Sequence, residues 1–216
     1  MIYPKHNFFA ESVYNVYLNH LLRKNFSRFL LTNDFPVISE EKGLIITPNH
    51  FSWWDGFFIN YLMTMFSKRK AYLMMLEEQL VKYPFFKYLG VFSVNPASLS
   101  SVKENLAFAE KISSDPANYL VLYPQGDIQP NKCEDVSLKN GLKFLSGKIT
   151  AEIMIVSFNI SYGNRKKPDV LCRFGDIMSS DFVSGNYDNY KNKFISNMNI
   201  PENELIKEKA FNIFDK

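Results

Sequence analysis

Residues 44–58 read LIITPNHFSWWDGFF and join two apolar runs through a short polar turn. The first run, 44–47, is rich in β-branched residues and ends at Pro48, which predicts a buried strand. The second run, 53–66, has the length and apolar content of a helix. His50, one of only three histidines, is therefore expected in a strand-to-helix turn, with Asp55 in the first turn of the helix.

The spacing of His50 and Asp55 limits how the two side chains can meet. Five positions on one regular helix lie about 140° apart, so the pair meets only if His50 precedes the helix. In open α/β folds ligands gather at the carboxyl ends of strands, which is where His50 falls. A structural alternative is that SWWD is a capping box, with Ser52 as the N-cap and Asp55 at the third helical position. The two interpretations are compatible, because capping would hold Asp55 within reach of the imidazole.

The rest of the chain alternates between helical and strand patterns. Helices are expected over 8–31, over 77–90 with a bend or stop at Pro84, over 99–113 and 138–147, and once or twice near the C-terminal end. Strands are expected over 71–76, 91–94, 118–123, 153–162 and 169–175. This alternation predicts an α/β fold, a mixed sheet flanked by helices on both faces.

We expect one domain over 1–216, since 46% hydrophobic residues suffice for a single core. Within it, 1–35 forms an N-terminal amphipathic helical segment, 40–165 the α/β core, and 166–216 a C-terminal strand and helices. The net charge of +3 gives little support for a nucleic-acid partner and suits an anionic lipid surface. Cys133 and Cys172 lack metal-ligand spacing, so reduced cytosolic thiols and no metal are expected.

Four blocks occur in a fixed order: NHFSWWD at 49–55, GVFSVN at 90–95, YPQGD at 123–127 and IMIVSFNI at 153–160. They resemble the N-H-x4-D, G-x-F-x-[IV]-R, F-P-E-G-T-R and [IV]-[VI]-P-V blocks of the glycerolipid acyltransferases, the family of lysophosphatidic acid acyltransferase. The resemblance covers roughly residues 40–165. It implies an enzyme of lipid biosynthesis that transfers acyl groups other than amino-acyl groups. The donor would be a thioester of coenzyme A or acyl carrier protein, with no further cofactor, and the acceptor a lipid hydroxyl.

The resemblance also implies roles for individual residues. His50 would be the general base, for which an imidazole with a reference pKa of about 6.5 is suited. Asp55 would fix its tautomer and stabilise the imidazolium. The residues expected to contact substrate are Phe92, Asn95, Pro124, Gln125, Gly126 and Asp127. Gly126 either lets substrate approach the backbone closely or is an ordinary turn glycine.

The chain departs from the family at four block positions, where Asn95 and Ile128 replace arginines, Gln125 replaces glutamate and Ser157 replaces proline. Neither Asn nor Ile can replace the bidentate fork that a guanidinium offers to phosphate. Two acceptor classes therefore remain open: a lysophospholipid-like acceptor, whose phosphate Lys132 or Lys103 would bind, and a neutral or zwitterionic hydroxyl lipid such as an amino-acid lipid, a glycolipid or a carotenoid glycoside. The same departures motivate a rival function, a non-catalytic lipid-binding or scaffolding relative. A thioesterase or lipase is disfavoured because no G-x-S-x-G elbow occurs.

Residues 8–31 combine apolar positions at helical spacing with Arg23, Lys24 and Arg28 near the end. Such a helix lies on a membrane surface or covers the sheet, and we favour the membrane. No run of about 18 apolar residues suggests a spanning helix, and Lys5, His6 and Glu11 interrupt any signal-peptide pattern. A peripheral position on the cytoplasmic membrane face is expected. Phe51, Trp53 and Trp54 either line the acyl chain or anchor at the interface, or simply pack in the core.

Overall fold

A computed structural model describes residues 1–131, 136–199 and 210–215. Within these ranges eight strands form one sheet in the order β4-β3-β5-β2-β6-β7-β1-β8. In chain order the strands are β1 (Phe29–Leu31), β2 (Gly43–Pro48), β3 (Lys70–Leu76), β4 (Val91–Val94), β5 (Asn118–Val121), β6 (Ala151–Ser161), β7 (Asp169–Ser179) and β8 (Phe211–Asn212).

The five adjacent strands β4, β3, β5, β2 and β6 are parallel to one another, whereas β7 runs antiparallel to β6. β1 pairs in parallel with β7, and β8 is antiparallel to β1. The predicted mixed α/β sheet is therefore confirmed. Because β2, β3, β4 and β5 run in the same direction, their carboxyl ends share one edge of the sheet, and the residues after β2 and β5 become neighbours there.

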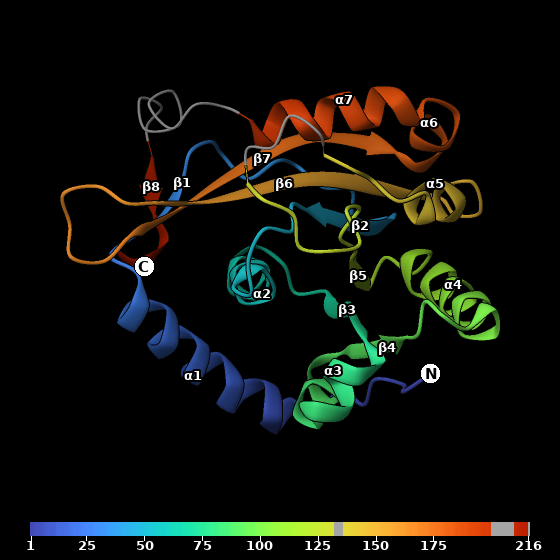
Figure 1. The fold of residues 1–216 in the computed structure, drawn as a ribbon, viewed down its shortest axis with the longest axis horizontal. Coiled ribbons are helices and arrows are strands. Elements are labelled where there is room, and N and C mark those ends of the chain that lie inside the picture. Colours follow the sequence, from blue (N-terminus) through green and yellow to red (C-terminus); the bar gives the residue numbers. More distant parts are fainter. Residues whose placement is uncertain (132–135, 200–209, 216) are drawn as a thin grey trace.

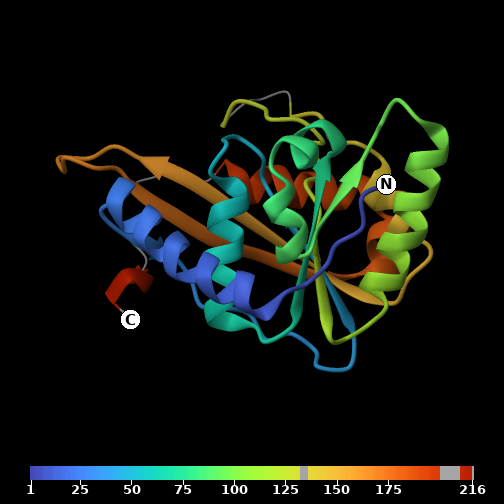
Figure 2. The ribbon, with the colours of Figure 1, turned by 90° about the horizontal axis from the view of Figure 1, so that it is seen from below.

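Helices cover both faces of this sheet (Figures 1 and 2). α1 (Phe8–Asn25) and α2 (Asp55–Phe66) lie on one face. α4 (Leu99–Ser113), α5 (Gly141–Ser146), α6 (Ser180–Gly185) and α7 (Tyr187–Met198) lie on the other. The short α3 (Glu77–Lys82) and the 3-10 helices η1 (Pro84–Leu89) and η2 (Ile213–Asp215) complete the set among the described residues. α3 ends before Pro84, as predicted, because a proline disfavours a helical conformation at the residue before it.

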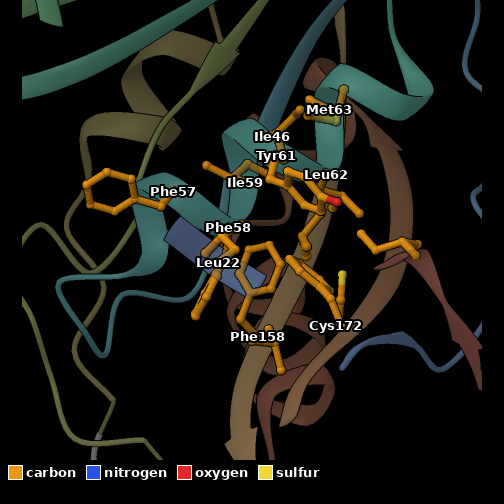
Figure 3. Close-up of a cluster of buried hydrophobic side chains, with 14 of the residues drawn as sticks. Leu22, Ile46, Phe57, Phe58, Ile59, Tyr61, Leu62, Met63, Phe158 and Cys172 are labelled. Carbon is orange, nitrogen blue, oxygen red and sulfur yellow. The ribbon is translucent and has the colours of Figure 1, made fainter. Parts of the chain in front are cut away.

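The central strand β2 is buried on both faces, which explains its unbroken apolar sequence. Leu44 and Ile46 face the cluster under α2, and Ile45 faces the cluster under α4. Figure 3 shows the α2 side, where Phe58 lies beside Phe158 of β6, with 5.6 Å between ring centroids. α1 contributes Leu22 to the same cluster. This packing holds α2, and with it Asp55 at the start of the helix, against the sheet.

The predicted helix over 8–31 was wrong beyond Asn25. α1 ends at Asn25, Phe26 is extended, and residues 29–31 form β1. β1 pairs residue by residue with Val170–Cys172, a partner about 140 positions away. Tertiary pairing therefore overrides the local helical pattern, which a reading of neighbouring residues does not detect.

Candidate active site

The turn after β2 is tied to β6 by Asn49, which is fully buried. Its backbone N–H donates to the carbonyl of Val156 at 3.2 Å. Its side-chain Oδ1 accepts from the N–H of Phe158 at 2.7 Å, and Nδ2 donates to the Phe158 carbonyl at 2.9 Å. The amide thus continues the ladder beyond Pro48 and sets the place from which His50 leaves the sheet. Asn49 was not among the predicted site residues, although its position between Pro48 and His50 placed it at the same turn.

Asp55 is the first residue of α2 and is completely buried. Its Oδ2 accepts hydrogen bonds from the N–H groups of Phe51 at 2.7 Å and Ser52 at 2.9 Å. The Ser52 hydroxyl donates to Oδ1 at 3.0 Å. The carboxylate therefore closes the turn that leads into the helix. The bonds of the capping-box alternative are partly present, since the Ser52 N–H donates to the Asp55 carboxylate and the Ser52 hydroxyl accepts from the Trp54 N–H, although α2 begins at Asp55.

His50 completes the set of donors, because its Nδ1 lies 2.9 Å from Oδ2 of Asp55. A carboxylate can only accept hydrogen bonds, so in the neutral imidazole Nδ1 carries the proton and Nε2 keeps its lone pair. The Asp55 side chain is fully buried, whereas 24% of the His50 side chain is exposed. The expected meeting of the two side chains across the turn is thus observed, and the free nitrogen belongs to a ring that solvent can reach.

Tyr123 and Gln125, from the third block, contact His50. The Tyr123 ring stacks on the imidazole, with 4.3 Å between centroids and 28° between planes. Burial raises the pKa of Tyr123 well above its ordinary value, and the charge of Asp55 raises it further, so the phenol is neutral. Gln125 is buried, and its Oε1 accepts from the backbone N–H of His50 at 2.5 Å.

The other third-block residues form the turn beyond Gln125. Pro124 is buried, and its carbonyl accepts from the N–H of Lys139 at 2.8 Å. Gly126 is exposed with φ of 75°, a left-handed conformation that glycine adopts without strain. Asp127 is exposed, and its carboxylate lies 3.5 Å from Nζ of Lys139. These three residues shape the loop, whereas Gln125 bonds directly to His50.

Two of the remaining block residues serve the fold. Phe92 was predicted to contact substrate, but it is fully buried on the α4 face, with its ring 5.1 Å from that of Phe108. The structure places it in the core on the face opposite Tyr123, because alternate residues of a strand point to opposite faces. Ser157 exchanges hydrogen bonds with Asn197 and so ties β6 to α7.

The positions that replace family arginines are both at the surface. Asn95 follows β4, is exposed, and its Oδ1 accepts from the N–H of Ala97 at 3.1 Å, an Asx turn leading to α4. Ile128 keeps 56% of its surface exposed. Lys103 is exposed on α4, whereas Lys132 and Cys133 lie outside the described residues.

A comparison with family models shows which family the chain belongs to. The family model "Acyltransferase" matches residues 28–161, a range that contains all four blocks. The chain belongs to the Acyltransferase family. The family and enzyme class predicted from the motifs are therefore confirmed.

A solved structure shares the fold of this acyltransferase. It is the crystal structure of the 1-acyl-sn-glycerophosphate (LPA) acyltransferase PlsC from Thermotoga maritima, with a TM-score of 0.58 and 14% identity. The match covers 87% of this chain and 78% of that chain. A comparison with curated proteins returns no significant match.

The aromatic residues inside the first block divide between packing and exposure. Trp54 of the acyltransferase packs edge-on against Phe26 at 5.0 Å and stacks with Phe58, which is core packing. Trp53 keeps 63% of its surface exposed. Within the described ranges no group of three or more His, Cys, Asp or Glu side chains is placed to hold a metal ion.

The donor set of Asp55 leads to a stability prediction for this acyltransferase. In Asp55→Asn the amide oxygen can take the place of Oδ2, and the amide nitrogen then faces the Ser52 hydroxyl, which can accept. We expect a loss of about 1 kcal/mol in the free energy of unfolding. Asp55→Ala leaves the N–H groups of Phe51 and Ser52 without acceptors, and the expected loss is roughly 3 kcal/mol. Urea unfolding measures both.

The exposed Asp188 on α7 offers the control, since Asp188→Ala should leave the unfolding midpoint unchanged. Equal losses for Asp55→Asn and Asp55→Ala would contradict the account. They would show that the charge of Asp55, and not its hydrogen bonds, closes the turn.

Proposed function

We propose that the protein is an O-acyltransferase that moves a fatty acyl group from a thioester of coenzyme A or acyl carrier protein to the hydroxyl of a lipid, with His50 as general base. The observation that carries the proposal is the 2.9 Å contact between Nδ1 of a partly exposed His50 and the fully buried carboxylate of Asp55. This pair combines a free Nε2 with a fixed partner for the imidazolium.

In the reaction, Nε2 of His50 removes the proton of the acceptor hydroxyl as its oxygen attacks the thioester carbonyl. The tetrahedral intermediate then collapses, the carbon–sulfur bond breaks, and the departing thiolate takes the proton from Nε2. Asp55 stabilises the imidazolium in between, because its Oδ2 already accepts from Nδ1. General base catalysis of this kind contributes about 10²- to 10⁴-fold to a rate.

The chain offers a matched control for His50. His6 makes a similar pair, with its Nδ1 2.8 Å from the carboxylate of Glu11, at the start of α1. In an assay of labelled acyl-thioester with a lipid extract, His50→Ala should lower transfer at least a hundredfold, whereas His6→Ala should leave it within about threefold.

If the transfer rate of His50→Ala lies within about threefold of the rate of the unmodified protein, the proposed mechanism is wrong. If the folded, unmodified protein binds lipid but transfers no acyl group, the rival function is favoured, a non-catalytic lipid-binding or scaffolding relative.

The acceptor we propose is a neutral or zwitterionic hydroxyl lipid, such as an amino-acid lipid or a glycolipid. Asn95 and Ile128 supply no positive charge where the family has arginines, and the Oδ1 of Asn95 is already held by Ala97. Lys103 is exposed on α4, so a phosphate that it alone bound would be held by a single mobile ammonium.

A competition assay with one acyl donor tests the acceptor. We expect the unmodified protein to prefer the neutral or zwitterionic lipids over lysophosphatidic acid. Hydrogen bonds to charged groups are worth about 1.5–3 kcal/mol each, so two restored arginines correspond to roughly two to four orders of magnitude. Asn95→Arg with Ile128→Arg should therefore raise the use of lysophosphatidic acid, since both positions are exposed. Preference of the unmodified protein for lysophosphatidic acid would contradict the proposed acceptor class.

The protein is further proposed to act at the cytoplasmic membrane face as a peripheral protein. α1 buries Tyr14, Leu18 and Leu22 against the core. Its outer side exposes Phe9 by 76% and Val16 by 74%. Phe8, Val13 and Tyr17 of α1, Val81 of α3, Phe85 of η1 and Trp53 are also exposed. We name these residues, with Phe9 and Val16, the α1 surface.

An exposed apolar surface of this kind, next to the basic residues at the end of α1, suits the interface of an anionic membrane. α1 thus both covers α2 and presents apolar side chains outward, so the two alternatives of the sequence analysis are compatible. Among the described residues, no helix has the length and apolar character needed to cross a membrane.

Sedimentation with vesicles tests the membrane proposal. Removing residues 1–31 would delete β1, so point changes are the cleaner probe. Phe9→Glu with Val16→Glu should abolish sedimentation with vesicles that contain anionic lipid, because two charges would enter the apolar contact. The control pair Val37→Glu with Phe144→Glu changes exposed apolar residues outside the α1 surface and should sediment normally. Equal sedimentation of both pairs would show that α1 only covers the core.

A further inference from the structure

We propose that the segment Tyr123–Gln129 holds the general base in position, and that Gln125 is its positioning residue; this inference rests on the proposed function of His50. The segment reaches His50 at three separate points. The Tyr123 ring supports the imidazole, Oε1 of Gln125 accepts from the His50 N–H, and the N–H of Gln129 donates to the His50 carbonyl at 2.9 Å. Ring, N–H and C=O of one residue are therefore all held by one stretch of chain.

The segment is itself fixed from a direction independent of β2. Gln129 holds Ser137 through two hydrogen bonds, in which Oε1 accepts from the Ser137 N–H at 3.1 Å and Nε2 donates to its carbonyl at 2.9 Å. The Pro124 carbonyl accepts from the N–H of Lys139, and the N–H of Gly126 closes a turn onto the carbonyl of Tyr123. A rigid support of this kind can limit the motion of the imidazole that it contacts.

The orientation of Gln125 is fixed by its partner. The His50 N–H is a donor, so the amide oxygen must face it, and Nε2 points the other way. That Nε2 is buried and finds no hydrogen-bond partner in the described parts of the chain, and the same is true of the Tyr123 hydroxyl. A buried donor without an acceptor destabilises a fold. Within the described residues, each of these two side chains thus has one polar group without a partner, while another part of it contacts His50.

A positioning role predicts a particular kinetic effect. Without the bond to Oε1, the His50 backbone can tilt and carry Nε2 away from the acceptor hydroxyl. A displacement of 1 Å at a reacting atom can cost about a hundredfold in rate. The loss should fall on kcat, because the bond from Gln125 acts on His50, the group that takes part in the chemical step.

Two substitutions keep the length of the Gln125 side chain and differ in whether it can accept a hydrogen bond from the His50 N–H. Gln125→Met removes the acceptor, and Gln125→Glu keeps an oxygen opposite the His50 N–H. With the preferred lipid acceptor, Gln125→Met should lower kcat about 10- to 100-fold with KM within about threefold, and Gln125→Glu should recover most of that loss. In NMR hydrogen exchange, the His50 amide should exchange faster in Gln125→Met than in either the unmodified protein or Gln125→Glu.

The exchange measurement needs no substrate, so it separates the two proposals. If the unmodified protein shows no transfer but the His50 amide is protected as predicted, the proposed function fails, whereas the hold of Gln125 on the His50 backbone stands. Unchanged kcat and unchanged exchange in Gln125→Met would overturn the positioning role. A raised KM at constant kcat would also overturn it, because Gln125 would then be a substrate-binding group.

Discussion

The carboxylate of Asp55 is the constraint on which the site depends. It lies where solvent does not reach, and a buried charge is tolerated only if hydrogen bonds compensate it. Four donors do so, namely the N–H groups of Phe51 and Ser52, the Ser52 hydroxyl and Nδ1 of His50. The first three of these hydrogen bonds shape the turn, and the bond with Nδ1 determines which nitrogen of the neutral imidazole carries the proton. One interaction therefore couples the start of α2 to the chemistry of His50, and its position at the N-terminus of α2 adds the favourable helix dipole.

The sheet brings the remaining parts to this carboxylate. β2 lies between β5 and β6, so the chain leaving its carboxyl end has the end of β5 on one side and β6 on the other. On the β6 side, Asn49 extends the ladder through its side chain. On the β5 side, the segment after Val121 supplies Tyr123 and Gln125. His50 is thus held between β6 and the segment that follows β5, because both strands are neighbours of β2 in the sheet. This arrangement explains why residues about 75 positions apart form one site.

Local patterns in the sequence were sufficient for the elements that depend on local physics. The strand stopped by Pro48, the helix after it and the break at Pro84 were all predicted, as was the meeting of His50 with Asp55. The ordered blocks also predicted the family. β1 was missed because residues 29–31 become a strand only through pairing with β7. Phe92 was misplaced because a motif does not show which face of a strand enters the core, and the contact of Gln125 with the His50 backbone depends on the packing of two loops.

The central claim is that Asp55 fixes the imidazole of His50 with the proton on Nδ1 and the lone pair on Nε2. The ¹⁵N chemical shifts of the His50 ring, measured by NMR at neutral pH, report this directly, because protonated and unprotonated ring nitrogens resonate far apart. The account predicts a protonated Nδ1 and an unprotonated Nε2 in the unmodified protein. A neutral ring with its proton on Nε2 would contradict it, since Asp55 would then face a lone pair and His50 could not serve as the base.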